Sequence, residues 1–286
     1  MVKKYVNQNF PNERDLYNSH NVELENCTFS GVEDGESALK ESSQITMNNC
    51  YMDLRYPLWH VEKLIMNGCT QTQNCRAALW YVKDADINNS TLGGIKALRE
   101  CSEINIEGCN INSAEFGWKS SDVCIKNSKI ASEYAFLNSE NLCLEKVEFS
   151  GKYSFQYCKH VQVKNSILNT KDAFWHAEKV TVENCEVTGE YIGWYSKDLT
   201  FINCKIKGTQ PFCYCEGLRL INCEMQDADL AFEYSDAVAD LKGKLISVKN
   251  FSKGTITVDE VGEIIVGNNV RPVNGKIIQR NKKDAL

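Results

Sequence analysis

A motif of eight residues recurs along most of the chain: apolar, any, apolar, any, Asn or Gly, Cys or Ser, any, apolar. From the copy at Ala85 to the copy at Leu218 the spacing is constant, and every step spans nineteen residues. The three earlier steps are less regular and include two longer ones, which fits small loop insertions. The copies begin at Val22, Ile45, Leu64, Ala85, Ile104, Val123, Leu142, Val161, Val180, Leu199 and Leu218, and Val238 is a candidate twelfth start.

The repeat predicts a coiled, all-β chain. Its apolar residues alternate with period two, which indicates strands rather than a helix. Nineteen residues are too few for a strand, a packed helix and two loops, so each strand must pair with its own copy one repeat later. Parallel strands connect preferentially in the right-handed sense. We therefore expect an all-β, right-handed parallel β-helix, a solenoid of about 11–12 coils with a 19-residue period.

The ends of the chain depart from the repeat. A solenoid needs caps because its terminal coils otherwise expose unpaired strand edges. We assign residues 1–21 to an N-terminal cap, 22–237 to the β-helix coils, and 238–286 to C-terminal strands that pack on the last coil. The segments 244–249, 254–258 and 262–266 have the composition of short strands.

Two columns of the repeat explain its unusual residues. The fifth position is Asn or Gly in every copy except the one with Lys146, which predicts a left-handed bend between two sheets. Stacked amides in this column can hydrogen-bond from coil to coil. The sixth position holds seven of the fourteen cysteines next to that bend, where a small inward side chain is needed.

Composition limits the partners and the compartment. A net charge of −6 and a pI of about 5.4 oppose attraction to nucleic acid or to an anionic membrane. The N-terminus lacks the apolar core of a secretory signal, and we expect a cytoplasmic protein with reduced thiols. A metal site at Cys185, Cys204 and Cys223, or at the Cys213–Cys215 pair, is a weaker interpretation than small buried side chains. We predict no metal and no cofactor.

The Asn ladder, the aliphatic stacks and the short period resemble the pectin-lyase-like β-helix fold. The Asn-Cys coils, with segments such as 173–177 (AFWHA), 254–258 (GTITV) and 261–265 (VGEII), resemble a family of bacterial β-helix proteins without an assigned function. This resemblance covers nearly the whole chain. It implies the fold and supplies no catalytic residues, because a fold does not dictate an activity.

Two adjacent columns precede each Asn-Cys strand and collect aromatic residues. All five tryptophans share one column with Lys, Arg and Gln, and a second column beside it is rich in Tyr and His. Flat rings mixed with hydrogen-bonding groups suit sugar rings, which have an apolar face and a rim of hydroxyls. The predicted ligand-binding residues are Trp59, Trp80, Trp118, Lys119, Tyr157, Trp175, His176, Trp194, Tyr195 and Tyr214.

Three functions remain open. The first is recognition of a carbohydrate-like ligand on the aromatic columns. The alternative is a non-catalytic interaction scaffold that binds a protein partner, or a homo-oligomer formed through the aromatic face or the ends of the rod, because stacked rings also stabilise a parallel sheet. Whether the chain is an enzyme stays open, with a lyase or glycoside hydrolase least favoured. Carboxyl pairs such as Glu100 with Glu115, or Asp172 with Glu190, are available, but the polygalacturonase motifs are absent.

Overall fold

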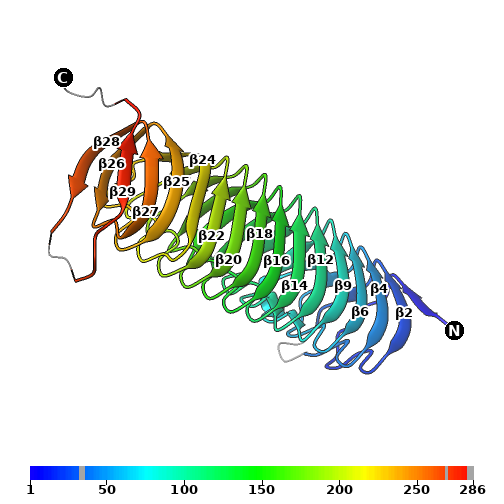
Figure 1. Ribbon diagram of the computed structural model, residues 1–286. Coiled ribbons are helices and arrows are strands. Elements are labelled where there is room, and N and C mark those ends of the chain that lie inside the picture. Colours follow the sequence, from blue (N-terminus) through cyan, green and yellow to red (C-terminus); the bar gives the residue numbers. More distant parts are fainter. Residues whose placement is uncertain (32–35, 268–269, 282–286) are drawn as a thin grey trace, which may run out of the picture. The chain divides into compact units, whose positions relative to one another are not determined.

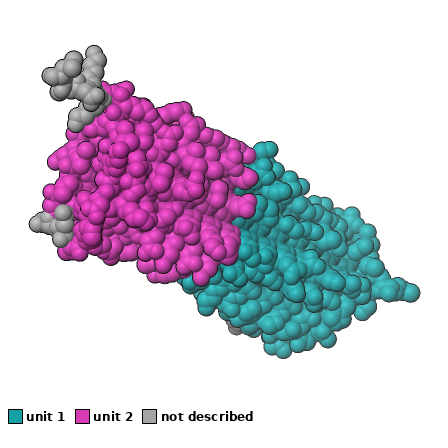
Figure 2. Space-filling model, in the orientation of Figure 1, with its two compact units in different colours: residues 1–150 teal, residues 151–286 magenta. Residues whose placement is uncertain are grey.

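The computed structural model describes residues 1–31, 36–267 and 270–281. It divides into two compact units, unit 1 (residues 1–150) and unit 2 (residues 151–286), coloured separately in Figure 2. The fold prediction is confirmed: the described chain is an all-β parallel solenoid with a 19-residue period. One number differs, because the solenoid has about 14 turns rather than 11–12.

In unit 1, each turn from β2 onward contributes a strand of six residues, here called the long strand, and a second strand that is shorter in most turns; the long strands run side by side in the same direction (Figure 1). The long strands are β2 (His20–Glu25), β4 (Ser43–Asn48), β6 (Glu62–Asn67), β9 (Lys83–Asn88), β12 (Ser102–Glu107), β14 (Ser121–Lys126) and β16 (Glu140–Glu145). The others are β1 (Lys3–Val6), β3 (Thr28–Phe29), β5 (Tyr51–Met52), β7 (Thr70–Gln71), β8 (Leu79–Trp80), β10 (Thr91–Gly93), β11 (Leu98–Arg99), β13 (Asn110–Asn112), β15 (Lys129–Tyr134) and β17 (Glu148–Lys152), with a 3-10 helix η1 at Gln73–Cys75.

Unit 2 repeats the pattern. The strands that continue the long series are β18 (Lys159–Lys164), β20 (Glu178–Glu183), β22 (Lys197–Ile202), β24 (Leu218–Gln226), β25 (Asp236–Lys242), β27 (Lys253–Val258) and β29 (Lys276–Gln279), the last of only four residues. The remaining strands are β19 (Ile167–Lys171), β21 (Glu186–Thr188), β23 (Lys205–Lys207), β26 (Lys244–Lys249) and β28 (Glu260–Ile265).

The register of the strands follows the sequence repeat. In β12 and β14, Ile104 pairs with Val123, and in β18 and β20, Val161 pairs with Val180, so each residue lies opposite its own copy in the next repeat. The alternating apolar residues point inward, as Ile104 and Val180 are at most 1% exposed. Stacking these side chains removes aliphatic surface from water at about 25 cal/mol per Å².

The bend column has left-handed backbone geometry throughout. Its Asn residues have φ between 48° and 54°, and Lys146 adopts φ 53° at the one position without Asn or Gly. In unit 2 the amides bond in series: Asn184 donates to Asn165 over 3.4 Å, Asn203 to Asn184 over 3.1 Å, and Asn222 to Asn203 over 2.7 Å. In unit 1, the amides of the column one residue earlier also bond from turn to turn: Asn67 donates to Asn48 over 2.9 Å.

The additional turns come from the chain segments outside the clear repeat. In unit 1, β1 pairs in parallel with β2, with Lys3 opposite Val22. In unit 2, β25 pairs in parallel with β27, and β27 with β29. β26 and β28 form a separate two-stranded parallel sheet. Strand pairing therefore continues where the sequence repeat is no longer recognisable, because a parallel ladder needs matched backbone and not identical side chains.

Candidate ligand-binding face

In unit 2, the turns before β18, β20, β22 and β24 each carry one ring of a ladder. We define the Tyr/His ladder as Tyr157, His176, Tyr195 and Tyr214, whose φ values lie between 53° and 62°. Backbone hydrogen bonds tie consecutive turns together: the amide of His176 donates to the carbonyl of Trp194 over 2.9 Å, and the amide of Tyr195 to that of Cys213 over 3.1 Å. The backbone thus holds the rings one above another.

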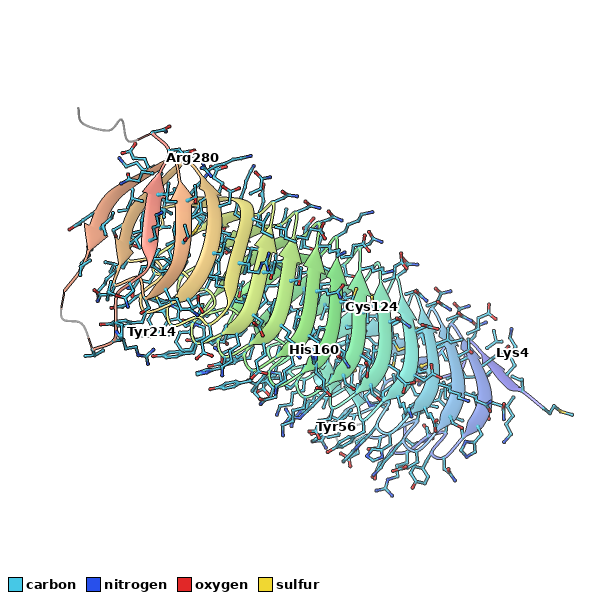
Figure 3. All side chains as sticks on the ribbon, in the orientation of Figure 1. Lys4, Tyr56, Cys124, His160, Tyr214 and Arg280 are labelled. Atoms are coloured by element: carbon cyan, nitrogen blue, oxygen red, sulfur yellow. The ribbon has the colours of Figure 1, made fainter. Side chains whose placement is uncertain are left out.

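The rings of this ladder lie almost parallel. Their centroids are 4.9, 5.1 and 4.6 Å apart along the series, with interplanar angles of 5°, 9° and 6°. Tyr157 is 49% exposed and Tyr195 41%. Figure 3 labels Tyr214, the last member, which projects from the turns of unit 2. Because each inner ring is covered on both faces by its neighbours, the ladder presents ring edges to solvent, and these edges bear the Tyr hydroxyls and the His ring nitrogens.

The two tryptophans of unit 2 form a second stack beside the ladder. The rings of Trp175 and Trp194 lie 5.5 Å apart at an angle of 6°, and both residues are half-buried. Their indole N–H groups donate to the carbonyls of Tyr191 and Gln210, each over 2.7 Å. The indole N–H groups of both side chains are therefore satisfied within the fold. The pair provides an apolar surface next to the ladder.

Charged residues next to the ladder are paired with each other. Lys159 lies 3.5 Å from Glu178, and Lys197 lies 3.5 Å from Glu216. Such exposed pairs add little stability, about 0–1 kcal/mol each. Because the charges beside the rings are paired with each other, hydrogen bonds from the ring edges are the main polar interaction that the ladder can offer a ligand.

The tryptophan column of unit 1 is organised differently. We define the cation–Trp stack as Lys40, Trp59, Trp80, Arg99 and Trp118. The Lys40 ammonium lies 4.3 Å from the Trp59 ring, Trp59 and Trp80 stack at 5.3 Å and 9°, and the Arg99 guanidinium lies 5.6 Å from the Trp80 ring and 5.2 Å from the Trp118 ring. The Lys and Arg between the tryptophans are therefore cation–π partners of the rings.

Other predicted site residues of unit 1 lie along this stack. Trp59, Trp80 and Trp118 are half-buried, and Lys119 is exposed in the neighbouring column. The indole N–H of Trp118 donates to the carbonyl of Tyr134 over 2.5 Å. The buried indole N–H groups of Trp59 and Trp80 have no hydrogen-bond partner among the described residues.

Glycine precedes a tryptophan twice because a phenylalanine from the next turn needs the space. A Cβ on Gly117 would lie 2.6 Å from the Phe136 ring, and one on Gly193 would lie 2.9 Å from the Phe212 ring. Both glycines also have positive φ, 74° and 77°. They do not turn the following tryptophans into the core, since Trp118 and Trp194 are as half-buried as the rest of the column.

The two carboxyl pairs differ in their surroundings. Glu100 and Glu115 both contact Arg99, at 3.3 and 3.6 Å, and Glu115 also lies 3.6 Å from Lys96, so two cations compensate the two carboxylates. Asp172 is 6% exposed, and burial raises the pKa of its carboxyl, with the negative charge of Glu190 adding to the effect and Lys171 opposing it. Glu190 itself lies 2.7 Å from Lys171. Asp172 with Glu190 is thus the pair with one carboxyl biased towards its neutral form.

Each unit also carries a cavity. One of about 340 Å³ lies on unit 1 over the outward face of β2, β4, β6 and β9, beside Glu23, Thr46 and Asp86. The other, of about 410 Å³, lies on unit 2 where the Tyr/His ladder ends, and is lined by Tyr214, Tyr234 and Arg271 among others. The sequence repeat does not predict the second cavity, because Arg271 belongs to a loop outside the repeat.

The cysteines carry no metal cluster in the part of the chain that the structure describes. No three or more His, Cys, Asp or Glu side chains gather there as a metal site would require. All fourteen cysteines are free thiols, and twelve of them are buried. No helix among the described residues has the length and apolar character to cross a bilayer.

Comparison with known proteins places the chain by sequence. Residues 3–279 match the family described as "Protein of unknown function (DUF3737)". None of the curated proteins compared with the chain matches it. Solved structures with a similar trace include a hyperthermoactive exopolygalacturonase from Thermotoga maritima, at 9% identity, 92% of this chain, 85% of that chain and a TM-score of 0.27. A periplasmic alginate epimerase is similar at 8% identity, 92% of this chain, 69% of that chain and a TM-score of 0.26. At these scores neither similarity assigns a residue role or a substrate.

Proposed function

The chain belongs to the DUF3737 family, whose description states no activity, and we propose from its own geometry that it binds an extended oligosaccharide along the Tyr/His ladder of unit 2. The observation that supports this is the row of ring edges, one per turn, repeated every 4.6–5.1 Å, in which Tyr157, His176 and Tyr195 are exposed and Tyr214 is half-buried. This repeat is close to the advance of one sugar along an extended chain, so successive sugars and successive turns stay in step.

On this ladder, a ligand would contact the edges of the rings rather than their faces. The stacked faces are covered, so a sugar cannot lie flat on an inner ring in the way we expected from the sequence. A Tyr hydroxyl both donates and accepts a hydrogen bond, which matches the hydroxyl rim of a sugar. The half-buried Trp175–Trp194 pair provides the apolar surface on which sugar C–H groups can rest.

The test separates the hydroxyl from the ring. A glycan array identifies the polymer that binds, and its oligomers of two to six sugars are then titrated against the protein. Tyr195→Phe keeps the stack and removes the hydroxyl, so we expect affinity to fall by about 2- to 10-fold, the value of one neutral hydrogen bond, with no change in melting temperature. Affinity should rise with oligomer length up to about four sugars and then level off, because the ladder has four stacked rings.

Tyr81→Phe is the matched control. Tyr81 is similarly exposed, at 39%, but lies in unit 1 against His60 and Trp80, outside the ladder. It should leave the titration unchanged. Equal effects of the two substitutions, or affinity that ignores oligomer length, would contradict the proposal.

A second candidate, a non-catalytic scaffold or self-associating protein, is favoured by the covered ring faces. A stack whose rings already satisfy each other stabilises the turns without any ligand. In that case Tyr195→Ala lowers the melting temperature, no glycan binds, and light scattering shows either an oligomer that Tyr195→Ala dissociates or a partner complex that needs the same face.

A further inference from the structure

The cavity of about 410 Å³ on unit 2 begins where the Tyr/His ladder ends. Its wall combines the rings of Tyr214 and Tyr234, 6.0 Å apart, with Ser252, Arg271 and the Lys253–Asp236 pair. This volume is within the range of small-ligand sites, which are mostly apolar with a few convergent polar groups. Burial of Tyr214, with the nearby carboxylate of Glu233, raises its pKa to about 12, so the phenol stays neutral at the cavity wall.

Arg271 is the charge in this wall that has no carboxylate partner among the described residues. Its guanidinium lies 5.7 Å from the centroids of both Tyr214 and Tyr234. The other charges are compensated, since Lys253 lies 2.8 Å from Asp236, and Glu216 lies 3.5 Å from Lys197. A guanidinium spread over two rings keeps its N–H edge available, and that edge binds a carboxylate in a bidentate manner.

Ser252 points to the same kind of ligand. Its Oγ is buried and has no hydrogen-bond partner among the described residues, although it lines the cavity. An unsatisfied buried hydroxyl destabilises the fold, so a ligand atom that accepts a hydrogen bond from it relieves a penalty already present. The loop that carries Arg271 is anchored nearby, because the amide of Val270 donates to the Tyr234 hydroxyl over 3.2 Å.

We propose that this cavity binds the carboxylate of an acidic sugar, with Arg271 and Ser252 holding the carboxylate and the tyrosine rings contacting the body of the sugar. The assignment to the end of a longer glycan rests on the proposed function, whereas binding of a single acidic sugar does not. Arg271 supplies the charge selectivity that the neutral ring edges of the ladder lack.

The experiment titrates the full chain with glucuronate, glucose and N-acetylglycine by calorimetry or saturation-transfer NMR. Glucuronate should bind roughly tenfold or more tightly than glucose, because a hydrogen bond to a charged group contributes about twice as much as a neutral one. N-acetylglycine, a carboxylate from a non-sugar source, should also bind more weakly than glucuronate. Equal binding of all three, or no binding of glucuronate, overturns the proposal.

Two variants and one control locate the site. Arg271→Gln should reduce glucuronate affinity to that of glucose. Ser252→Ala should lower glucuronate affinity by about 2- to 10-fold while keeping or raising the melting temperature, since it deletes an unsatisfied buried group. Arg14→Gln is the control, because Arg14 also lies over a tyrosine ring, 5.8 Å from Tyr17, away from this cavity. Glucuronate binding that survives Arg271→Gln, or falls equally in the control, contradicts the site.

The binding measurements distinguish failure of the cavity proposal from failure of the ladder proposal. Tyr195→Phe should leave the binding of free glucuronate unchanged, because Tyr195 does not line the cavity. Loss of oligosaccharide binding with intact glucuronate binding removes the ladder proposal alone. Intact oligosaccharide binding without any preference for glucuronate removes the cavity proposal alone.

Discussion

The buried carboxyl of Asp172 shows that the surroundings of a residue, and not its type alone, determine how tightly it holds a proton. Asp172 has φ 53°, and its carbonyl accepts a hydrogen bond from the Gln156 amide over 3.4 Å. Burial raises the pKa of its carboxyl above the ordinary value of 3.8. The native state therefore holds this proton more tightly than the unfolded chain does, and stability is lost as pH rises from about 3.8 through the raised native pKa.

Because the pKa of Asp172 is raised, we predict that Asp172→Asn stabilises the protein at neutral pH. Asn is neutral at every pH and tolerates the left-handed backbone, so the variant should melt at a higher temperature than the parent at neutral pH. The difference should shrink as pH falls, because the parent carboxyl then becomes neutral as well. Melting curves between about pH 3 and about pH 8 test this linkage.

Asp198→Asn is the matched control for that measurement. Asp198 has the same φ of 53° but is exposed. Its substitution should change the melting temperature little at any pH. A rise for Asp198→Asn equal to that for Asp172→Asn would show that burial is not the cause.

At the scale of the elements, the Asn column determines where each turn bends between its two strands. Asn203 has φ 53°, donates to Asn184 over 3.1 Å and accepts from Asn222 over 2.7 Å. The column thus combines a backbone preference with a series of amide hydrogen bonds. Lys146, also left-handed, shows that the stacked turns can impose the backbone geometry without an amide side chain.

We predict that Asn203→Leu destabilises unit 2 by about 2 kcal/mol more than Asn203→Gly. Leucine has to adopt a left-handed backbone, which costs about 1–3 kcal/mol, whereas glycine adopts it freely. Both variants lose the same amide hydrogen bonds, so their difference isolates the backbone contribution. Urea denaturation of both proteins measures it, and identical midpoints would contradict the proposed role of the bend.

At the scale of the whole molecule, the cysteines follow the division between inside and outside that the coil imposes. Twelve thiols are buried, whereas Cys124 and Cys143 are partly exposed and pair directly across β14 and β16. Burial raises the pKa of the Cys75 and Cys101 thiols to about 12. Buried and protonated thiols react slowly, because the thiolate is the nucleophile.

We therefore predict that, in the native protein, the two partly exposed thiols react with a thiol reagent faster than the twelve buried ones, and that all fourteen react in denaturant. Cys124→Ser and Cys143→Ser should each lower the fast count by one. Burial, and then the neighbouring Cys143, raise the pKa of Cys124 to about 11, so its rate should increase with pH. A larger native count, or a stoichiometric metal by elemental analysis, would contradict this picture.

The sequence by itself determined the parallel coil, the register of its strands, the inward columns and the left-handed bend. These features are predictable because each turn repeats the same local chemistry: Val161 and Val180 occupy one column whatever the rest of the chain does. The same periodicity identified the aromatic columns. It did not predict the additional turns, since the pairing of β1 with β2 depends on backbone contacts and not on a recognisable motif.

Only the tertiary structure decided what those columns can do. Ring spacing alone does not show that His176 is covered on both faces, or that Arg99 lies between two tryptophans, because both depend on rotamers chosen against neighbouring turns. Arg271 is distant from Tyr214 along the chain, in a loop without period, and no local pattern places it over that ring. Contacts between distant segments arise from packing in three dimensions, and for that reason the cavity they form could not be read from the repeat.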